Sequence, residues 1–507
     1  MATVSAIPSG ARSEHRGLAY WMDRVQKEME SVRAAPDVDA VHKLRVAIRR
    51  CRSLASVMEE VDTDPAWPAM RKAARKLFRG LGDLRDAQVM DAWVGKLGPS
   101  GDPLREQLHA AFESSEPKLR EGALRFAHKF DEKLWSRLER HLRQRARLVP
   151  VASLAAECLA LERLEDAKEL HSRALRTEKP KPWHALRIGL KRFRYTVENL
   201  LPEHYAAWSD NLKRLQDLLG DVHDLDVLAA MIHKADAAEP EDARKTWDEI
   251  IARERRERIE TYRQLTLGKT SLWNEWRSNL PHNGRLEAAA TARLRATARA
   301  ADTRPRRTSQ VSRIAIALFD ALRRVEAGSL FVDESSSRIL RAAARLHRTG
   351  AGDGKSPQKA ARKFLLSLKV PPGWSREEWE TLAWSVRYHR GPEPKPKNSA
   401  FAQLPESQQQ KIRTAAGLLR LARALRKSGI ESVSGLRAEK SGEALLLRVP
   451  GLDDSAESAA RLAAAKHLLE LGLARPLVLK PIPKPEKLLV LPPQQSAIPQ
   501  PSAAASD

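Results

Sequence analysis

Apolar residues recur at spacings of three and four from Arg16 to about Leu280, which is the periodicity of amphipathic α-helices. Prolines interrupt this pattern repeatedly, and helices usually begin or end at such residues. The interrupting prolines are Pro36, Pro65, Pro68, Pro103, Pro150, Pro180, Pro182 and Pro202. The first part of the chain is therefore predicted to be a bundle of helices.

The pattern changes beyond this bundle. A polar, Ala/Arg-rich stretch ends at residues 303–307 (TRPRR), and helical periodicity then continues from Ser309 to about Lys427. Residues 444–449 (ALLLRV) and 476–479 (PLVL) are typical of short strands, and they flank an Ala-rich helix. A small β-α-β appendage is predicted there. The proline-rich end of the chain favours extended, disordered structure.

An internal repeat organises the first part of the chain. Residues 42–52 (HKLRVAIRRCR) are echoed by residues 184–194 (HALRIGLKRFR), in which every basic position except Lys43 recurs. Residues 81–89 (LGDLRDAQV) are likewise echoed by residues 219–227 (LGDVHDLDV), in the same order and at nearly the same distance. We interpret the helical bundle as a duplication.

Each copy carries a stripe of positive charge along one helix. With His42 at zero on a helical wheel, Arg49, Arg45 and Arg52 fall at roughly −20°, −60° and −80°, opposite the apolar positions. The second stripe consists of His184, Arg187, Lys191 and Arg194. Like charges at these spacings repel one another, so helix stability alone does not favour the stripe. Two matched stripes on one cavity would suit phosphate groups, because arginine binds their oxygens bidentately.

Overall charge favours a polyanionic partner. The chain has 89 basic and 65 acidic side chains and a formal net charge of +24 at pH 7. Its 42% of hydrophobic residues suffices for a packed core. Two cysteines, Cys51 and Cys158, provide no disulfide framework. With neither a signal-peptide pattern nor a membrane-spanning stretch, we expect a cytoplasmic protein.

The acidic residues of the second repeated motif allow two interpretations. Asp83, Asp86, Asp221 and Asp224 could ligate a metal, but they more readily orient nearby cations such as Arg85. We therefore predict no metal site. Lys213, which lies on the same predicted helix as the second motif, adds a further phosphate contact or is simply exposed.

The paired stripes and the Leu-Gly-Asp segments that follow them resemble the conserved-histidine α-helical domain (CHAD). The resemblance implies an internally duplicated helical fold whose basic residues line a central cavity and bind inorganic polyphosphate without catalysis. It carries over to His42, Arg45, Arg49, Arg50, Arg52, Arg85, His184, Arg187, Lys191, Arg192, Arg194 and Lys213. His223 stands where the first copy has Arg85, so its role is open.

A second resemblance covers the later helices. Residues 342–350 (AAARLHRTG), 384–391 (WSVRYHRG), 401–405 (FAQLP) and 418–425 (LLRLARAL) are similar to the helical, HD-like C-terminal domain of exopolyphosphatases and guanosine pentaphosphate phosphohydrolases. Arg348 and Arg423 occupy positions where the HD pattern has aspartates. Because a guanidinium cannot ligate a metal, we expect a degenerate domain without metal, cofactor or catalysis.

These observations predict a mainly α protein in which a duplicated bundle precedes a helical HD-like domain with a β-α-β appendage. The predicted boundaries are a flexible N-terminus at 1–11, a CHAD domain at 12–285 with repeats at about 12–150 and 151–285, a linker at 286–308, the degenerate domain at 309–480 and a disordered tail at 481–507. The expected function is non-catalytic binding of inorganic polyphosphate, with association with polyphosphate granules as a consequence. Nucleic-acid binding and phosphohydrolase activity are the alternatives.

Overall fold

The computed structural model describes residues 17–234, 241–325, 333–350, 356–395, 397, 399–430, 432–453 and 455–482. The predicted flexible N-terminus at 1–11 and all but two residues of the predicted tail lie outside these ranges. The chain divides into two compact units. The first unit comprises Met1–Ser309 and Arg338–Pro392, and the second comprises Gln310–Ser337 and Glu393–Asp507.

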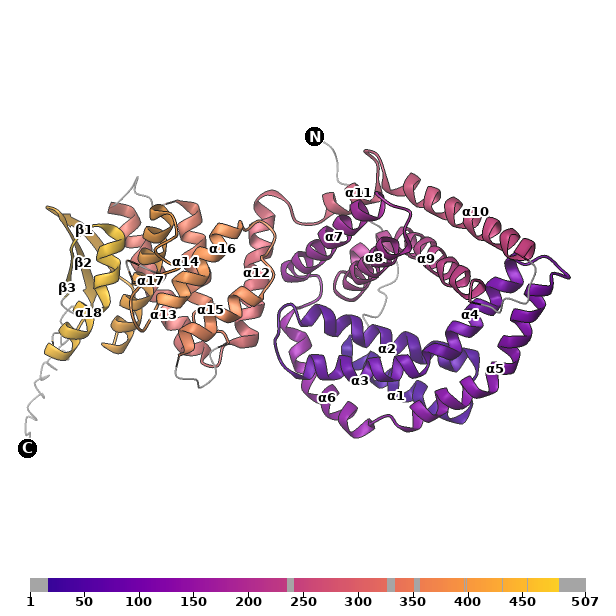
Figure 1. Ribbon diagram of the computed structural model, residues 1–507. Helices are drawn as coiled ribbons and strands as arrows, with labels where there is room; N and C mark the ends of the chain where they lie inside the picture. The colour runs from indigo at the N-terminus through magenta and orange to yellow at the C-terminus, as the bar shows by residue number, and fades with distance from the viewer. Residues whose placement is uncertain are drawn as a thin grey trace, which may run out of the picture. The chain divides into compact units, whose positions relative to one another are not determined.

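The first unit begins with two successive sets of helices (Figure 1). The first set contains α1 (Leu18–Ala34), α2 (Val38–Met58), α3 (Ala66–Gly80), α4 (Gly82–Leu97), α5 (Pro103–His128), α6 (Glu132–Arg145) and the short 3₁₀ helix η1 (Ala146–Leu148). The second set contains α7 (Leu154–Ala174), α8 (Pro180–Leu200), α9 (Pro202–Ile232), α10 (Glu241–Thr266) and α11 (Leu272–Asn279). In this order α8 corresponds to α2, and α9 to α3 plus α4, as the duplication predicts.

Local sequence signals place the helix starts. Pro103, Pro180 and Pro202 occupy the first position of α5, α8 and α9, where the missing amide hydrogen is not needed. The Asp37 carboxylate caps α2 by accepting a hydrogen bond of 2.7 Å from the backbone N–H of Ala40. Most of the predicted proline breaks therefore lie at helix boundaries, whereas Pro68 and Pro182 lie inside the first turns of α3 and α8.

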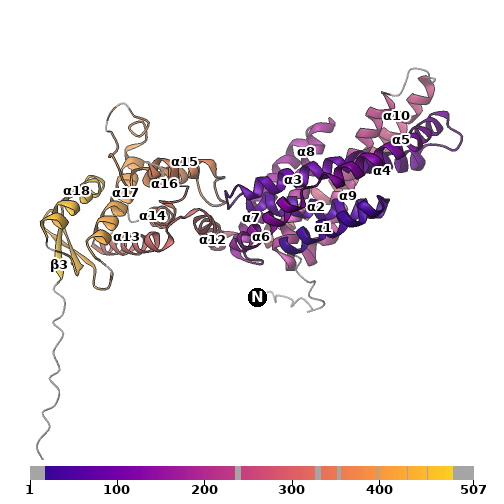
Figure 2. The ribbon, with the colours of Figure 1, turned by 90° about the horizontal axis from the view of Figure 1, so that it is seen from below.

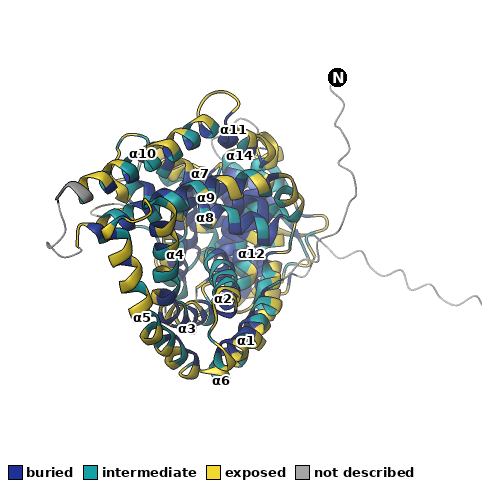
Figure 3. Cartoon of the chain, turned by 90° about the vertical axis from the view of Figure 1, so that its right-hand side faces the viewer, coloured by how far each residue is buried: buried dark blue, intermediate teal, exposed yellow. Residues whose placement is uncertain are grey.

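The two repeats share one apolar core. Helix α2 packs against α8 and α4 packs against α9, so the charged helices of the two repeats are in contact. The apolar face of α2 is fully buried at Leu44, Ile48 and Cys51. By contrast, α5 buries only a few residues and presents a largely exposed outer surface (Figure 3). The stripe residues are consequently held on helices in the packed interior of the unit.

One difference breaks the symmetry of the duplication. Helices α3 and α4 are separated at Leu81, whereas the matching Leu219 lies inside the continuous helix α9. The carbonyl groups that end α3 therefore need partners outside their own helix, while those of α9 are satisfied along the helix.

The rest of the first unit extends this bundle. Helix α12 (Asn283–Ala301) packs on α7, and α15 (Pro357–Ser367) packs on α16 (Arg376–Tyr388). Arg293 of α12 forms an ion pair of 3.1 Å, from Nε to Oε1, with Glu162 of α7, and both side chains are buried. Most of the segment predicted as a linker at 286–308 is therefore a packed helix.

Two helices run from one unit into the other, α13 (Pro305–Val325) and α14 (Glu334–Leu346). The second unit also holds α17 (Glu406–Lys427), β1 (Arg437–Ser441), β2 (Ala444–Pro450), α18 (Ala456–Leu473) and β3 (Leu477–Ile482). Helix α18 lies between α17 and the sheet (Figure 2). Within the described ranges, no helix is long and apolar enough to cross a membrane.

The small sheet confirms the predicted β-α-β appendage and adds one strand. Strand β2 pairs in parallel with β3, from Leu445 opposite Leu477, and antiparallel with β1. The polar sequence of β1 (RAEKS) gave no strand signal, which is typical of an exposed edge. Pro481 and Ile482, which were assigned to the tail, complete β3; a proline is tolerated there because β3 is also an edge strand.

Candidate functional site

The structure brings the stripes of the two repeats together at their centres. Burial is the largest cause that lowers the pKa of both Arg187 and Lys191 on α8, and the positive charge of Arg49 on α2 lies close enough to lower both further. Arg45 belongs to the same group, because the charge of Arg49, after burial, also lowers the pKa of Arg45. We call Arg45, Arg49, Arg187 and Lys191 the central cluster. Its members are equivalent positions of the two repeats, 142 residues apart in sequence: Arg45 with Arg187, and Arg49 with Lys191.

Arg45 has a structural task within this cluster. Its guanidinium donates hydrogen bonds from Nη1 to the carbonyl oxygens of Leu81 at 2.9 Å and Phe78 at 3.4 Å, at the end of α3. It also lies over the Phe78 ring, 4.2 Å from the centroid, and its Nη2 is 3.8 Å from Asp86. Arg45 therefore caps the break between α3 and α4 and is only partly available to a ligand.

Arg187 occupies the same position in the second repeat but lacks this task. Helix α9 is continuous, so it offers no free carbonyl groups at the matching place. The Nε atom of Arg187 is buried and has no hydrogen-bond partner among the described residues. A buried donor without a partner is costly, and a bound oxyanion would satisfy it.

Lys191 is the most strongly perturbed cation of the cluster. Burial, followed by the charges of Arg187 and Arg49, lowers its pKa from about 10.5 to about 7. Asp224 opposes this shift without restoring the ordinary pKa value. Lys191 is thus held in an excess of positive charge, which is the environment that a polyanion would relieve.

The acidic residues of the repeated motif contact different partners: some face the central cluster, and one bonds to a neighbouring helix. Burial raises the pKa of both Asp86 and Asp224, which face the arginines of the central cluster. Asp221, however, accepts a hydrogen bond of 2.9 Å from Arg258 of α10. In the part of the chain that the structure describes, no group of three or more His, Cys, Asp or Glu side chains is arranged to hold a metal ion.

The histidines at the heads of the stripes lie in different surroundings. His42 is exposed, and burial and the charge of Arg85 are the two largest causes that lower its pKa. His184 is half-buried, with its Nδ1 3.2 Å from Nδ1 of His223. Burial, then Arg187, lowers the pKa of His223 to about 4. His223 therefore belongs to the site, although it replaces the Arg85 of the first copy.

The surroundings of three other predicted arginines, Arg50, Arg192 and Arg194, differ. Arg50 forms an ion pair with Glu198 that joins α2 to α8, and it packs between Trp21 and Tyr195. Its counterpart Arg192 is exposed. Arg194 is half-buried and lies near Lys191, whose pKa it helps to lower, and its Nη2 donates to the Tyr205 hydroxyl at 3.5 Å. Arg50 thus serves the contact between the repeats.

A second basic group adjoins the first stripe. Arg52 lies over the Phe78 ring, 5.0 Å from its centroid, and the charges of Arg71 and Arg75 on α3 lower its pKa after burial. Sequence analysis missed Arg71 and Arg75. The repeat itself held the signal, because Arg75 precedes the motif aspartate by eight residues, as Lys213 does in the second copy.

Lys213 lies in less positive surroundings than the stripes. It is exposed on α9 and lines a shallow hollow with Asp210, Arg214, Asp217 and Asp221. Three carboxylates in this hollow offset its charge. The structure therefore does not join Lys213 to the central cluster through any described contact.

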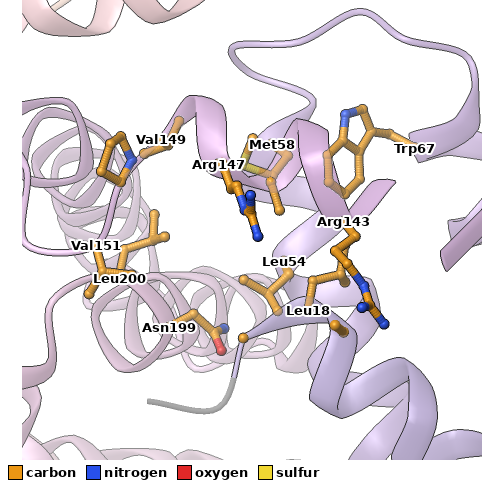
Figure 4. A pocket seen from close by; sticks show the side chains of 14 residues that line it. Leu18, Leu54, Met58, Trp67, Arg143, Arg147, Val149, Val151, Asn199 and Leu200 are labelled. Carbon is orange, nitrogen blue, oxygen red and sulfur yellow. The ribbon is translucent and has the colours of Figure 1, made fainter. Parts of the chain in front are cut away.

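A cavity of about 640 Å³ borders α2 at Leu54 and Met58, and none of the stripe residues lines it (Figure 4). Its walls are mainly apolar and include Leu54, Met58 and Trp67, and Arg143 and Arg147 also line it. Because a phosphate chain needs a polar lining, the chemistry favours the stripe over this cavity despite its volume.

The predicted HD-like residues occupy two different units. His347 and His389 are buried in the first unit, with ring centroids 5.0 Å apart. The Nδ1 of each donates to a carbonyl of the helix that precedes it, Ala344 at 2.9 Å and Val386 at 2.6 Å. Arg348 follows His347, whereas Arg423 lies on α17 in the second unit.

Comparison with known proteins agrees with both resemblances. Residues 17–233 match the CHAD domain, and residues 296–470 match domain III of Ppx/GppA phosphatases. The chain therefore contains a CHAD domain followed by a Ppx/GppA domain III. The crystal structure of the CHAD domain from the plant Ricinus communis is similar, with 21% identity, 52% of this chain and 88% of that chain covered, and a TM-score of 0.37. No curated protein matches the sequence.

Proposed function

We propose that this protein binds inorganic polyphosphate at the central cluster and does not cleave it. One observation carries the proposal: the charge of Arg49 in the first repeat acts on Arg187 and Lys191 of the second, and the buried Nε of Arg187 has no hydrogen-bond partner among the described residues. The association of CHAD domains with polyphosphate binding, and of Ppx/GppA proteins with polyphosphate metabolism, supports it.

The chemistry of the cluster suits a phosphate chain better than a nucleic acid. Polyphosphate has about one negative charge per phosphate and no bases, so closely spaced cations suffice to bind it. Binding of single strands usually needs exposed aromatic faces for base stacking. Here Arg45 and Arg52 lie over the Phe78 ring, and Phe193 is fully buried.

The proposed lack of catalysis rests on the region that matches a phosphatase domain. Arg348 and Arg423 stand where the HD pattern places carboxylates, and a hydrolase of this type needs a metal or a positioned acid and base. We accordingly propose that the chain retains polyphosphate, and that it associates with polyphosphate granules where these exist.

A competition titration tests the proposal. Purified full-length protein bound to labelled long-chain polyphosphate is challenged with unlabelled polyphosphate, single-stranded DNA and duplex DNA at one fixed salt concentration. We expect unlabelled polyphosphate to compete at least ten-fold better, per phosphate, than either nucleic acid, and no orthophosphate to be released with magnesium or manganese. Equal competition by DNA would refute the assigned ligand, and release of orthophosphate would refute the absence of catalysis.

A further inference from the structure

A second group of arginines gathers around the buried histidine pair of the first unit. The ring centroids of His347 and His389 are 5.0 Å apart, and of the arginines that follow them, Arg390 lies close enough for its charge to act on Arg348. An isolated β-bridge between Asp302 and Thr349 brings the end of α12 to the same place. Three segments that are distant in sequence thus meet at Arg348.

The charges at this meeting point are mostly positive. Arg304, Arg307 and Arg390 all lower the pKa of Arg348, whose largest perturbation is burial, and Asp302 alone among the leading contributors raises it. Asp302 also accepts a hydrogen bond of 2.9 Å from the backbone N–H of Arg304. The Nε of Arg348 is buried, and within the described ranges it has no hydrogen-bond partner. We call Arg304, Arg307, Arg348 and Arg390 the second cluster.

The start of α13 adds to this positive potential. Helix α13 begins at Pro305, and its first turn contains no acidic residue but does contain Arg306 and Arg307. The N-terminus of a helix has a partial positive charge, so arginines there destabilise the free protein slightly. An anion at this position would be bound by the guanidinium groups and favoured by the positive potential of the helix terminus.

We propose that the second cluster is a separate binding site for a compact phosphate group of two or three phosphates. Its groups would be Arg348 and Arg390 at the histidine pair, and Arg304 and Arg307 at the start of α13. Such a ligand could be the end of a polyphosphate chain or the diphosphate of a nucleotide, since both present the same closely spaced oxyanions. The second cluster shares no residue with the central cluster, so the two sites can be tested separately.

The test uses full-length protein with Arg187→Gln and Lys191→Gln, which weaken the central cluster. Calorimetric titration with pyrophosphate, tripolyphosphate and guanosine diphosphate should show one bound equivalent of at least one probe. Tighter binding of the inorganic probes assigns a chain end, and tighter binding of guanosine diphosphate assigns a nucleotide. Adding Arg348→Gln and Arg390→Gln should weaken binding at least ten-fold. Absence of binding to all three probes would refute the site.

A matched pair of variants separates binding from folding. Arg306→Glu and Arg307→Glu change the same exposed turn of α13, but only Arg307 is among the leading charges that act on Arg348. Both should raise the melting temperature of the free protein, because an acid suits a helix N-terminus. Of the two variants, only Arg307→Glu should lose most of the rise in melting temperature that the tightest-binding probe produces. If both variants retain that stabilisation equally, or lose it equally, the second cluster is not the site.

Discussion

Arg45 and Arg187 show how one residue position can acquire two roles in a duplicated protein. Both arginines occupy the same place in their stripes, yet Arg45 bonds to the carbonyls of Leu81 and Phe78, while the Nε of Arg187 is buried without a partner in the described structure. The first contributes to stability and the second is kept at a cost to stability. Such a cost is common at binding sites.

This contrast predicts opposite effects on stability. Arg45→Met should lower the free energy of unfolding by about 1–2 kcal/mol, because two carbonyls lose their donor. Arg187→Met should leave it unchanged or raise it by about 1 kcal/mol, because a buried charge is replaced by an apolar group. Urea unfolding of both variants measures the difference. Equal losses from the two substitutions would contradict the assigned roles.

Lys191 predicts a pH dependence of polyphosphate binding. Its pKa is about 7 in the free protein, and a bound polyanion should raise it. Above pH 7 the free protein holds Lys191 mainly neutral while the complex protonates it, so binding takes up a proton and weakens as pH rises. Well below pH 7 Lys191 is charged in both states, and this dependence disappears. Calorimetry at pH 8 in buffers of different ionisation enthalpy measures the uptake.

Lys191→Arg is the control for this experiment, since a guanidinium stays charged throughout and should abolish the uptake at pH 8. Uptake that persists unchanged in Lys191→Arg would exclude Lys191 as the linked group. The sequence suggests a further uptake at His42 and His184 as pH falls through roughly 7 to 6, and the lowered pKa values of both histidines have the required direction.

At the scale of elements, the sequence predicted helices more readily than their contacts. Proline positions and apolar spacing identified the starts of α5, α8 and α9, because these signals are local. The break between α3 and α4 was not predicted, since the sequences around Leu81 and Leu219 are nearly identical. Strand β1 was missed because a polar edge strand has no apolar alternation.

Close packing of α17 on α18 depends on two glycines. A Cβ atom on Gly417 would lie 2.6 Å from the backbone of Leu469, and one on Gly472 would lie 2.6 Å from the backbone of Thr414. Gly417→Ala should therefore destabilise the second unit by roughly 1–3 kcal/mol. Gly95→Ala in α4, where a Cβ meets nothing within 4 Å, should instead stabilise by up to about 1 kcal/mol. Thermal unfolding distinguishes them, and a neutral Gly417→Ala would contradict this packing.

At the scale of the whole molecule, the repeat was the most informative feature of the sequence. It predicted the duplicated fold and the two stripes, because equivalent positions can be identified by aligning the two halves of the first domain with each other. It could not show that Arg50 pairs with Glu198, or that Lys213 lies among carboxylates, since both depend on how distant helices pack. The convergence of Arg49 on Arg187 and Lys191 likewise required the structure.

The central claim is that both repeats form a single polyphosphate site, and the stoichiometry of tripolyphosphate binding tests it most directly. This probe is too short to join distant faces of the protein. Arg49→Gln in the first repeat and Arg187→Gln in the second should each remove the same single bound equivalent, and the double variant should remove no more. If the double variant loses two equivalents, one for each substitution, the stripes are separate surfaces and the account is wrong.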